Sequence, residues 1–392
     1  MHGVKRERTT AQAKAARKAK EAARLESYLE VESRFFELRD ANDLSPAALE
    51  QTTKLLSFNP EFFTVWNYRR AILSHLFESE SEPSQEDATK TAASESGPES
   101  QEAKDARRNV LLQDDLELTM HALRAHPKVY WIWSHRTWCL ENLPDPKADG
   151  SKWKRELKLA EHMLELDPRN FHGWDYRRYL LVQLSQPSSR SSPTSFSSST
   201  LTFPEALPTP LLQQELTYTL RKIEANFSNF SAWHQRSRCL PALWAREQVA
   251  PSERAKQRDE EFELIRQAMY TDPSDSSIWI YHRWLVDQEL EEEAAVEGQE
   301  GEAGSGRGVH VFDREVAGIE ELLEMEPDSK WCLETVARYR SLQRTRLLST
   351  GGLQKDDDAE KELTAKIRDL LSRLKRIDPL RQARYEDWEH TL

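Results

Sequence analysis

One segment recurs five times along this chain of 392 residues, and each copy contains a tryptophan at the same place. Four copies carry a proline six residues before the tryptophan, and Phe227 takes that place in the fourth copy. Four copies carry an arginine three residues after the tryptophan, and the fifth has His282 there. A unit repeated in this way folds as an array in which each copy packs on its neighbours. The five tryptophans are Trp66, Trp133, Trp174, Trp233 and Trp279, and the four arginines are Arg69, Arg136, Arg177 and Arg236.

Each copy predicts a helical hairpin. A polar residue followed by proline ends one helix and opens the next, because proline lacks the N–H that a first turn leaves unpaired and its φ is already helical. Apolar residues then follow at helical spacing, as in Trp66, Leu73 and Phe77 of the first copy. Another amphipathic segment precedes each proline. A single hairpin cannot bury its own apolar face, so the sequence predicts an all-α solenoid of stacked hairpins, and no alternating pattern favours a strand.

The array is predicted to form a single helical-repeat domain over residues 1–392. Its repeats lie around 45–78, 109–141, 152–184, 211–243 and 254–288, and capping helices follow over 312–392. Three insertions separate the repeats, rich in Glu and Ser, in Ser and Pro, and in Glu and Gly. Such compositions do not bury a core, so disordered loops are expected at about 79–104, 185–210 and 291–308.

Composition excludes several classes of protein. The net charge of -12 disfavours a nucleic-acid binder, which needs a basic face. Aromatic residues with interleaved arginines can bind single-stranded RNA, but the helical spacing and acidic total favour packing. No run approaches the ~20 apolar residues of a spanning helix. The three cysteines are far apart, so neither a disulfide framework nor a Cys-based zinc site is expected. Free thiols of this kind suit a protein of the reducing cytoplasm.

The hairpin with Pro-x5-Trp-x2-Arg resembles the α-subunit repeat of the protein prenyltransferases. The resemblance spans Asn59 to Val286 and extends to the ends of the chain. It implies a right-handed α-α superhelix and an obligate heterodimer with a β subunit. The tetratricopeptide repeat has a 34-residue period and a different signature. A non-enzymatic helical scaffold of that type is the alternative from another functional class.

Within this family the chain resembles the α subunit of the type II, Rab-directed geranylgeranyltransferase. The resemblance rests on Met1-His2-Gly3, NFHGWDYRR from Asn170, NFSNFSAWH from Asn226 and TDPSDSSIWIYHRWL from Thr271. It implies transfer of geranylgeranyl from geranylgeranyl diphosphate to C-terminal cysteines of Rab GTPases presented by an escort protein. The alternative is the α subunit shared by farnesyltransferase and the type I enzyme. Because the chain stops at Leu392, a compact fungal-type subunit without the extra animal domains is expected.

The resemblance also implies the site residues. Zinc is expected on the β subunit, with no metal held by this chain alone. Lys128, in Pro127-Lys128-Val129-Tyr130, would stabilise the leaving diphosphate. Without the resemblance it is an ordinary exposed lysine in a turn. Four further residues are expected at the substrate cleft, with packing or capping between hairpins as the alternative: Tyr130, Asn170, Phe171 and His172.

The repeated residues themselves are expected to be structural. The five tryptophans should anchor one hairpin to the next, and the arginines should form ion pairs or bind backbone carbonyls. Phe171 stands where the farnesyl-type subunit carries a tyrosine, so no role for a hydroxyl is expected there. His2 is a weak candidate for reaching the partner's zinc from a mobile arm, and an unordered residue is the alternative.

Overall fold

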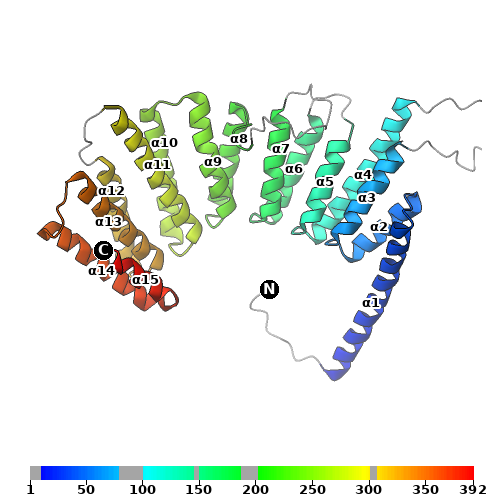
Figure 1. Ribbon diagram of the computed structural model, residues 1–392, viewed down its shortest axis with the longest axis horizontal. Coiled ribbons are helices and arrows are strands. Elements are labelled where there is room, and N and C mark those ends of the chain that lie inside the picture. The colour runs from blue at the N-terminus through cyan, green and yellow to red at the C-terminus, as the bar shows by residue number, and fades with distance from the viewer. Residues whose placement is uncertain (1–9, 79–99, 145–149, 187–201, 301–306) are drawn as a thin grey trace, which may run out of the picture. The chain divides into compact units, whose positions relative to one another are not determined.

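The structure is a computed structural model that describes residues 10–78, 100–144, 150–186, 202–300 and 307–392, with the side chains of 295–300 and 307–309 excepted. Its regular elements are helices, and no strand occurs in these residues, which confirms the all-α prediction. Packing divides the chain into two compact units, Met1–Ser198 and Ser199–Leu392 (Figure 1).

The first unit holds α1 (Ala11–Asp40), α2 (Pro46–Phe58), α3 (Phe63–Glu78), α4 (Gln101–Ala125), α5 (Tyr130–Asn142), α6 (Ser151–Leu166) and α7 (Phe171–Ser185). The second unit holds α8 (Thr209–Ala225), α9 (Phe230–Glu247), α10 (Pro251–Thr271), α11 (Ser276–Glu300), α12 (Arg307–Met325), α13 (Lys330–Thr350), α14 (Asp358–Ile377), the 3-10 turn η2 (Pro379–Arg381) and α15 (Gln382–His390). Consecutive helices pack in pairs, with α2 on α3, α4 on α5 and α6 on α7 in the first unit. The pairs α8 with α9, α10 with α11 and α12 with α13 follow in the second.

The spacing between proline and tryptophan in each repeat has a direct structural cause. In the second repeat the indole Nε1 of Trp133 donates a hydrogen bond of 2.9 Å to the carbonyl of Pro127. The same bond joins Trp66 to Pro60, Trp174 to Pro168, Trp233 to Phe227 and Trp279 to Pro273. The bond uses a carbonyl oxygen, so Phe227 replaces proline without loss of the contact. All five indoles are buried and close the turn between the two helices of a hairpin.

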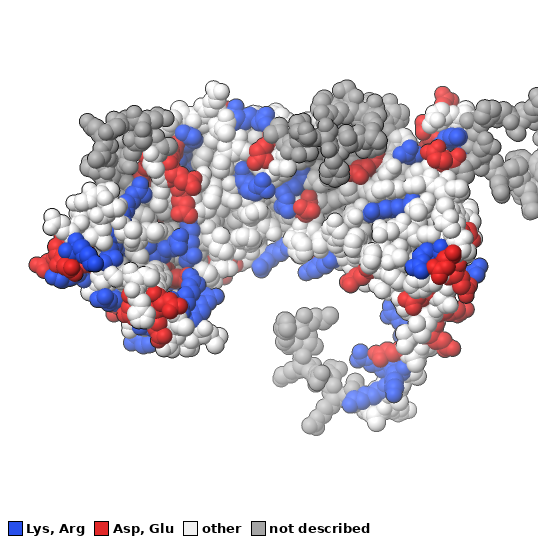
Figure 2. Space-filling model, viewed as in Figure 1, with Lys and Arg blue, Asp and Glu red and all other residues white. Residues whose placement is uncertain are grey.

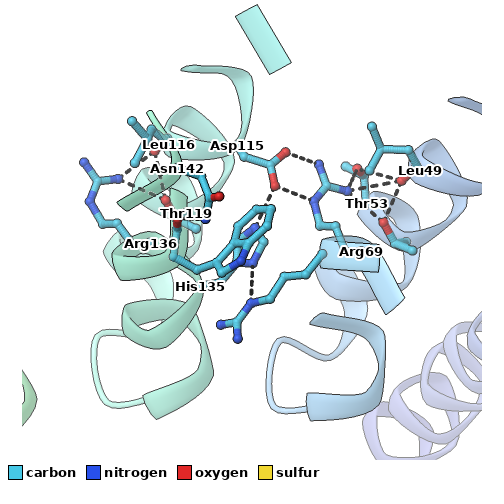
Figure 3. A network of polar contacts seen from close by, with 12 residues as sticks. Leu49, Thr53, Arg69, Asp115, Leu116, Thr119, His135, Arg136 and Asn142 are labelled. Atoms are coloured by element: carbon cyan, nitrogen blue, oxygen red, sulfur yellow. Dashed lines mark hydrogen bonds and ion pairs between the residues drawn. The ribbon is translucent and has the colours of Figure 1, made fainter. Parts of the chain in front are cut away.

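The arginine three residues after the tryptophan joins consecutive hairpins (Figure 3). Arg136 on α5 donates to both carboxylate oxygens of Glu156 on α6, at 2.5 and 3.0 Å. Its Nη1 also donates to the carbonyl of Leu116 and to the hydroxyl of Thr119 on α4. One guanidinium therefore ties the helix before it to the helix after it. Burying such charges is tolerable because each is paired and hydrogen-bonded.

The same pattern returns in the first and fourth repeats, where Arg69 pairs with Asp115 and Arg236 pairs with Glu261. In the third repeat Arg177 pairs with Glu161, on the first helix of its own hairpin. For Arg69, Arg136 and Arg236 the acid lies on the first helix of the following hairpin. It also binds a side chain 20 residues further along the chain, on the second helix of that same hairpin. That side chain is His135 for Asp115, Tyr176 for Glu156 and Tyr281 for Glu261. Arg69, Arg136 and Arg236 thus make both kinds of contact expected of them, ion pairs and bonds to backbone carbonyls.

The predicted disordered insertions include residues that the structure places in helices. Residues 101–104 begin α4, and residues 291–300 continue α11. Glu and Ala are strong helix formers, and a prediction from charge alone overlooks that propensity. Phe203 and Leu207 are buried within the second predicted insertion, so residues 202–208 pack against the fold. Residues 79–99, 187–201 and 301–306 lie outside the described residues.

Candidate active site at two neighbouring turns

The predicted site residues come from two turns that lie against each other. The turn between α4 and α5 carries Lys128, and the turn between α6 and α7 begins with Asp167 and ends at Asn170. Helices α5 and α7, which follow these turns, are in contact. The residues are therefore brought together by the stacking of two hairpins, although 42 positions separate Lys128 from Asn170 in the sequence.

Asn170 holds the two turns together. Its Oδ1 accepts hydrogen bonds from the backbone N–H groups of His172 and Gly173, which caps α7. Its Nδ2 donates to the carbonyl of Pro127 at 2.9 Å. The residue is only 2 % exposed. The expectation that Asn170 faces a cleft is therefore corrected, because its side chain is fully engaged with backbone.

Lys128 follows that bonded carbonyl directly and points to the surface. Its Nζ lies 3.5 Å from Oδ2 of Asp167, and its side chain is 73 % exposed. An exposed pair at this distance contributes little stability, about 0–1 kcal/mol. The ammonium group can consequently exchange Asp167 for a stronger anionic partner at small cost, while the backbone beneath it is held by Asn170.

Aromatic side chains begin the helices that follow these two turns. Tyr130 is the first residue of α5 and Phe171 the first of α7, and both are mostly exposed. The ring of His172 lies 6.2 Å from that of Tyr130 and 4.0 Å from that of Phe171, measured between centroids. Exposed aromatic residues that gather in one place are typical of a binding surface. Tyr130, Phe171 and His172 thus gather at the starts of α5 and α7, next to the turn that carries Lys128.

His172 is held in its neutral form. Partial burial lowers the pKa of its imidazole, and a hydrogen bond to the backbone of Lys128 offsets only part of that effect. A neutral imidazole beside Lys128 adds no positive charge that would repel the ammonium group. It also provides a third link between the two turns, after Asn170 to Pro127 and Asp167 to Lys128.

Gly173 lets α7 approach α6 closely. A Cβ atom at this position would lie 3.0 Å from Cδ2 of Leu164. That distance is tighter than nearly all real Cβ contacts, so a larger residue would require the Leu164 side chain to shift by a few tenths of an ångström. The glycine therefore lets the start of α7, with Asn170 and His172, pack closely on α6.

Two contributors were not foreseen from the sequence. Asp167 is the partner of Lys128, and Phe63, the first residue of α3, packs on Trp131 with ring centroids 5.5 Å apart. The place of Phe63 in its repeat could have revealed it, because Phe63, Tyr130 and Phe171 all stand three residues after the repeat proline. His2 lies outside the described residues.

One buried group of described residues has the geometry of a metal site, Asp115, His135 and Cys139, whose donor atoms lie within 4.8 Å of one another. Its donor atoms are already engaged. Arg69 binds both oxygens of Asp115, and His135 lies 2.6 Å from one of them. Burial raises the pKa of the Cys139 thiol, which keeps it protonated. The group does not fit a zinc ion, because a cation would have to displace the guanidinium of Arg69.

The charged surface does not favour nucleic acid. On the face drawn in Figure 2, lysine and arginine side chains are interspersed with aspartate and glutamate over the described residues. A phosphate backbone would meet both signs of charge there. None of the described helices is long and apolar enough to cross a membrane.

Comparison with known proteins adds independent information. A family model described as protein prenyltransferase alpha subunit repeat matches residues 45–76, 112–143, 153–184, 212–243 and 258–289. The chain is 33 % identical over 396 residues to the geranylgeranyl transferase type-2 subunit alpha of Schizosaccharomyces pombe, covering 98 % of this chain and 96 % of that protein. It is 28 % identical over 410 residues to the Candida albicans protein of the same name, with the same coverage.

Two further matches differ in extent. The rat geranylgeranyl transferase type-2 subunit alpha is 33 % identical over 288 residues, which are 73 % of this chain and 42 % of the rat protein. Among solved structures, Candida albicans protein geranylgeranyltransferase-I complexed with GGPP aligns with a TM-score of 0.54 at 18 % identity. That alignment covers 93 % of this chain and 90 % of the other, and it supports the fold alone.

Proposed function

Because this chain belongs to the family of protein prenyltransferase α subunits, and within it to the geranylgeranyl transferase type-2 α subunits, we propose that it is one half of a heterodimeric geranylgeranyltransferase. The other half is a β subunit, which holds a zinc ion and the isoprenoid pocket. The zinc ion, when bound there, activates the acceptor thiolate. The heterodimer acts in the cytoplasm on Rab GTPases that an escort protein presents.

The reaction forms one bond and breaks another. The thiolate sulfur of a C-terminal cysteine bonds to C1 of the geranylgeranyl group, and the C1–O bond to diphosphate breaks with its electron pair leaving on oxygen. Negative charge therefore grows on the diphosphate. A fixed cation beside those oxygens lowers the barrier because it binds the transition state more strongly than the ground state.

Lys128 is the residue that we assign to this role, and its position is the observation that carries the proposal. It is an exposed ammonium group on a turn whose carbonyl is held by Asn170, and the exposed rings of Tyr130 and Phe171 begin the helices after this turn and the neighbouring one. The rings offer apolar contact to a prenyl chain or peptide, while Lys128 offers charge to the diphosphate. Neutral His172, whose single ring N–H is bonded to the backbone of Lys128, helps to hold this turn without adding a second positive charge.

The test is single-turnover prenyl transfer by the purified heterodimer, with geranylgeranyl diphosphate and a Rab protein bound to its escort protein. Lys128→Ala should slow transfer on the order of 100-fold, as loss of one transition-state donor does. Binding of geranylgeranyl diphosphate should change much less. Lys158→Ala, which removes an exposed lysine of α6, is the matched control and should leave the rate unchanged.

Further conditions of the same assay separate this function from its alternatives. Farnesyl diphosphate in place of geranylgeranyl diphosphate tests the isoprenoid, and omission of the escort protein tests the acceptor. Efficient transfer to a free peptide without the escort would favour the α subunit shared by farnesyltransferase and the type I enzyme. A full rate for Lys128→Ala would refute the assignment of this lysine.

A further inference from the structure

A cavity in the second unit has unmet hydrogen-bonding capacity. It measures about 210 Å³ and lies between α13 and α15. Glu334 and Arg338 line it from α13, and Arg384 and Trp388 line it from α15. In each helix the two residues are four positions apart, so they lie on one face of that helix. The proposed chemistry at Lys128 uses none of these residues.

Glu334 is the most informative residue of the cavity. It is 2 % exposed, and its Oε1 accepts a hydrogen bond of 2.9 Å from Nη2 of Arg384. Nη2 of Arg283, on α11, lies 3.5 Å from the same oxygen. The second oxygen, Oε2, is buried and has no hydrogen-bond partner among the described residues. Leaving a buried, charged acceptor unpaired is unfavourable, so a donor is expected to complete it.

The charges around the cavity define the rest of a ligand. Arg283, Arg338 and Arg384 bring three positive charges, and Glu334 brings one negative charge. Asp287 on α11 interacts electrostatically with Arg283 and Arg338 and brings a second negative charge. These five side chains together carry three positive and two negative charges. A singly charged anion balances the excess among them, whereas a metal cation would increase it.

The ligand must therefore combine a monoanion for the arginines with a hydrogen-bond donor for Glu334. The last residue of a polypeptide has both, because its backbone N–H and its α-carboxylate are attached to one Cα atom. Capture of a terminal carboxylate is a recurring mode of peptide recognition. The volume equals about seven water molecules at ~30 Å³ each, enough for one residue but not for a folded element. The indole of Trp388 provides an apolar wall for its side chain.

The chain's own C-terminus is bound elsewhere. The carbonyl oxygen of Leu392 accepts a hydrogen bond of 2.8 Å from Nη2 of Arg344, which also pairs with Glu360. The wall formed by α15 is fixed as well, since Tyr385 is fully buried and donates to Asp378. The cavity is thus a preformed space rather than a place that α15 vacates.

From these contacts we propose that the cavity between α13 and α15 binds the C-terminal residue of another polypeptide. The α-carboxylate lies on Arg338 and Arg384, and the last backbone N–H donates to Oε2 of Glu334. This binding does not depend on prenyl transfer.

The test uses isothermal titration calorimetry on the full-length chain in its heterodimer. The probe is the blocked dipeptide acetyl-Ala-Leu with a free carboxylate. Its amide, acetyl-Ala-Leu-NH2, removes the anion, and a version with an N-methylated leucine removes the donor. Each loss should weaken binding about tenfold or more, the usual worth of a hydrogen bond to a charged group. Acetyl-Ala-Asp-Leu-NH2 tests whether an internal acidic side chain substitutes for a terminus.

Variants place the binding in this cavity. Arg338→Gln changes an exposed side chain and should weaken the free-acid peptide about tenfold or more while leaving the amide unaffected. Glu334→Gln should remove the penalty for N-methylation, because the amide nitrogen then faces the ligand. Arg368→Gln, at an exposed position of α14, is the matched control. Equal affinity for acid and amide, absent binding, or stronger binding of the internal aspartate or of inorganic phosphate would overturn the proposal.

Discussion

The interior of each hairpin and the turn at its end follow opposite rules. In the interior the same contacts recur at the same spacing, as Arg69, Arg136 and Arg236 each bind an acid of the following hairpin. At the turn the backbone recurs but the side chain does not. The residue after the repeat proline, or after Phe227, is Glu61, Lys128, Arg169, Ser228 or Ser274. Recurrent residues therefore build the array, and a residue that occurs once is free to carry chemistry.

The largest expected effect separates the two regions directly. Arg136→Ala leaves Glu156 buried and unpaired, which should lower the free energy of unfolding by about 3–5 kcal/mol. Chemical denaturation of the heterodimer, followed by circular dichroism, measures the change. Lys128→Ala should alter stability by less than about 1 kcal/mol although it abolishes most activity. Arg155→Ala, at an exposed position of α6, is the control. A comparable loss of stability from Lys128→Ala would remove the distinction.

Asn170 links the buried interior of a hairpin to the turn that carries Lys128, so its substitution tests how the two regions depend on each other. Asn170→Asp keeps an acceptor for the cap of α7 but replaces the Nδ2 donor to Pro127 with a carboxylate oxygen. The turn that carries Lys128 should shift, and transfer should slow about tenfold, because small misplacement of a catalytic group is costly. The single-turnover rate measures this effect.

A double-mutant cycle shows whether Asn170 acts through Lys128. In a Lys128→Ala background the further loss caused by Asn170→Asp should vanish. Asn229→Asp is the matched control, since Asn229 caps α9 in the same way but its Nδ2 has no hydrogen-bond partner among the described residues. Losses that multiply in the double mutant would mean that Asn170 contributes structure alone.

The buried histidine of the second repeat makes stability depend on pH. Burial lowers the pKa of His135, and its bonds to Asp115 compensate only in part. The unfolded chain therefore binds this proton first as pH falls below about 6.5. Stability should decline from pH 6.5 to 5 by at most about 1.4 kcal/mol per pH unit for this group.

His135→Gln is the variant that isolates this contribution. The fourth repeat already carries Gln235 at the matching position, where it donates to Glu215. The variant should keep the bond to Asp115 and lose the part of the pH dependence that His135 causes. An unchanged slope in denaturation curves at the two pH values would assign the dependence to other groups.

The smallest effect is expected where the repeat departs from its own pattern. Phe227→Pro retains the carbonyl that Trp233 binds and restores the residue found in the other four copies. The preceding residue, Asn226, already has the extended backbone that a following proline requires. Stability should change by less than about 1 kcal/mol. A larger loss than Trp233→Phe causes would show that the phenyl ring itself contributes.

The sequence was sufficient for the hairpins because local periodicity determines them. Pro127 and Trp133 are six positions apart, and one hydrogen bond explains the interval. The partners of the arginines were not predicted, since Glu156 meets Arg136 only after the hairpins have stacked in register. A signal was nevertheless present, in the constant interval of 20 residues from each acid to the side chain that it also binds.

That the proposed site residues come together was predictable, but their geometry was not. Lys128, Tyr130, Phe171 and His172 gather at neighbouring turns, yet the burial of Asn170 depends on the position of the Pro127 carbonyl in another repeat. A one-dimensional pattern does not report such a distance. The predicted bounds of the insertions were wrong for another reason. Composition alone does not separate a charged helix such as 291–300 from a charged loop.

The fixed interval of 20 residues also limits how such a chain can change in length. Adding or deleting one residue between Glu156 and Tyr176 would rotate the second helix and separate two buried partners. The gap between one hairpin and the next has no such restriction. The chain accordingly carries its extra length at 79–99, 187–201 and 301–306, between helical pairs and never inside the interval. New sequence can therefore enter this protein at the junctions while Lys128 and its supports stay in register.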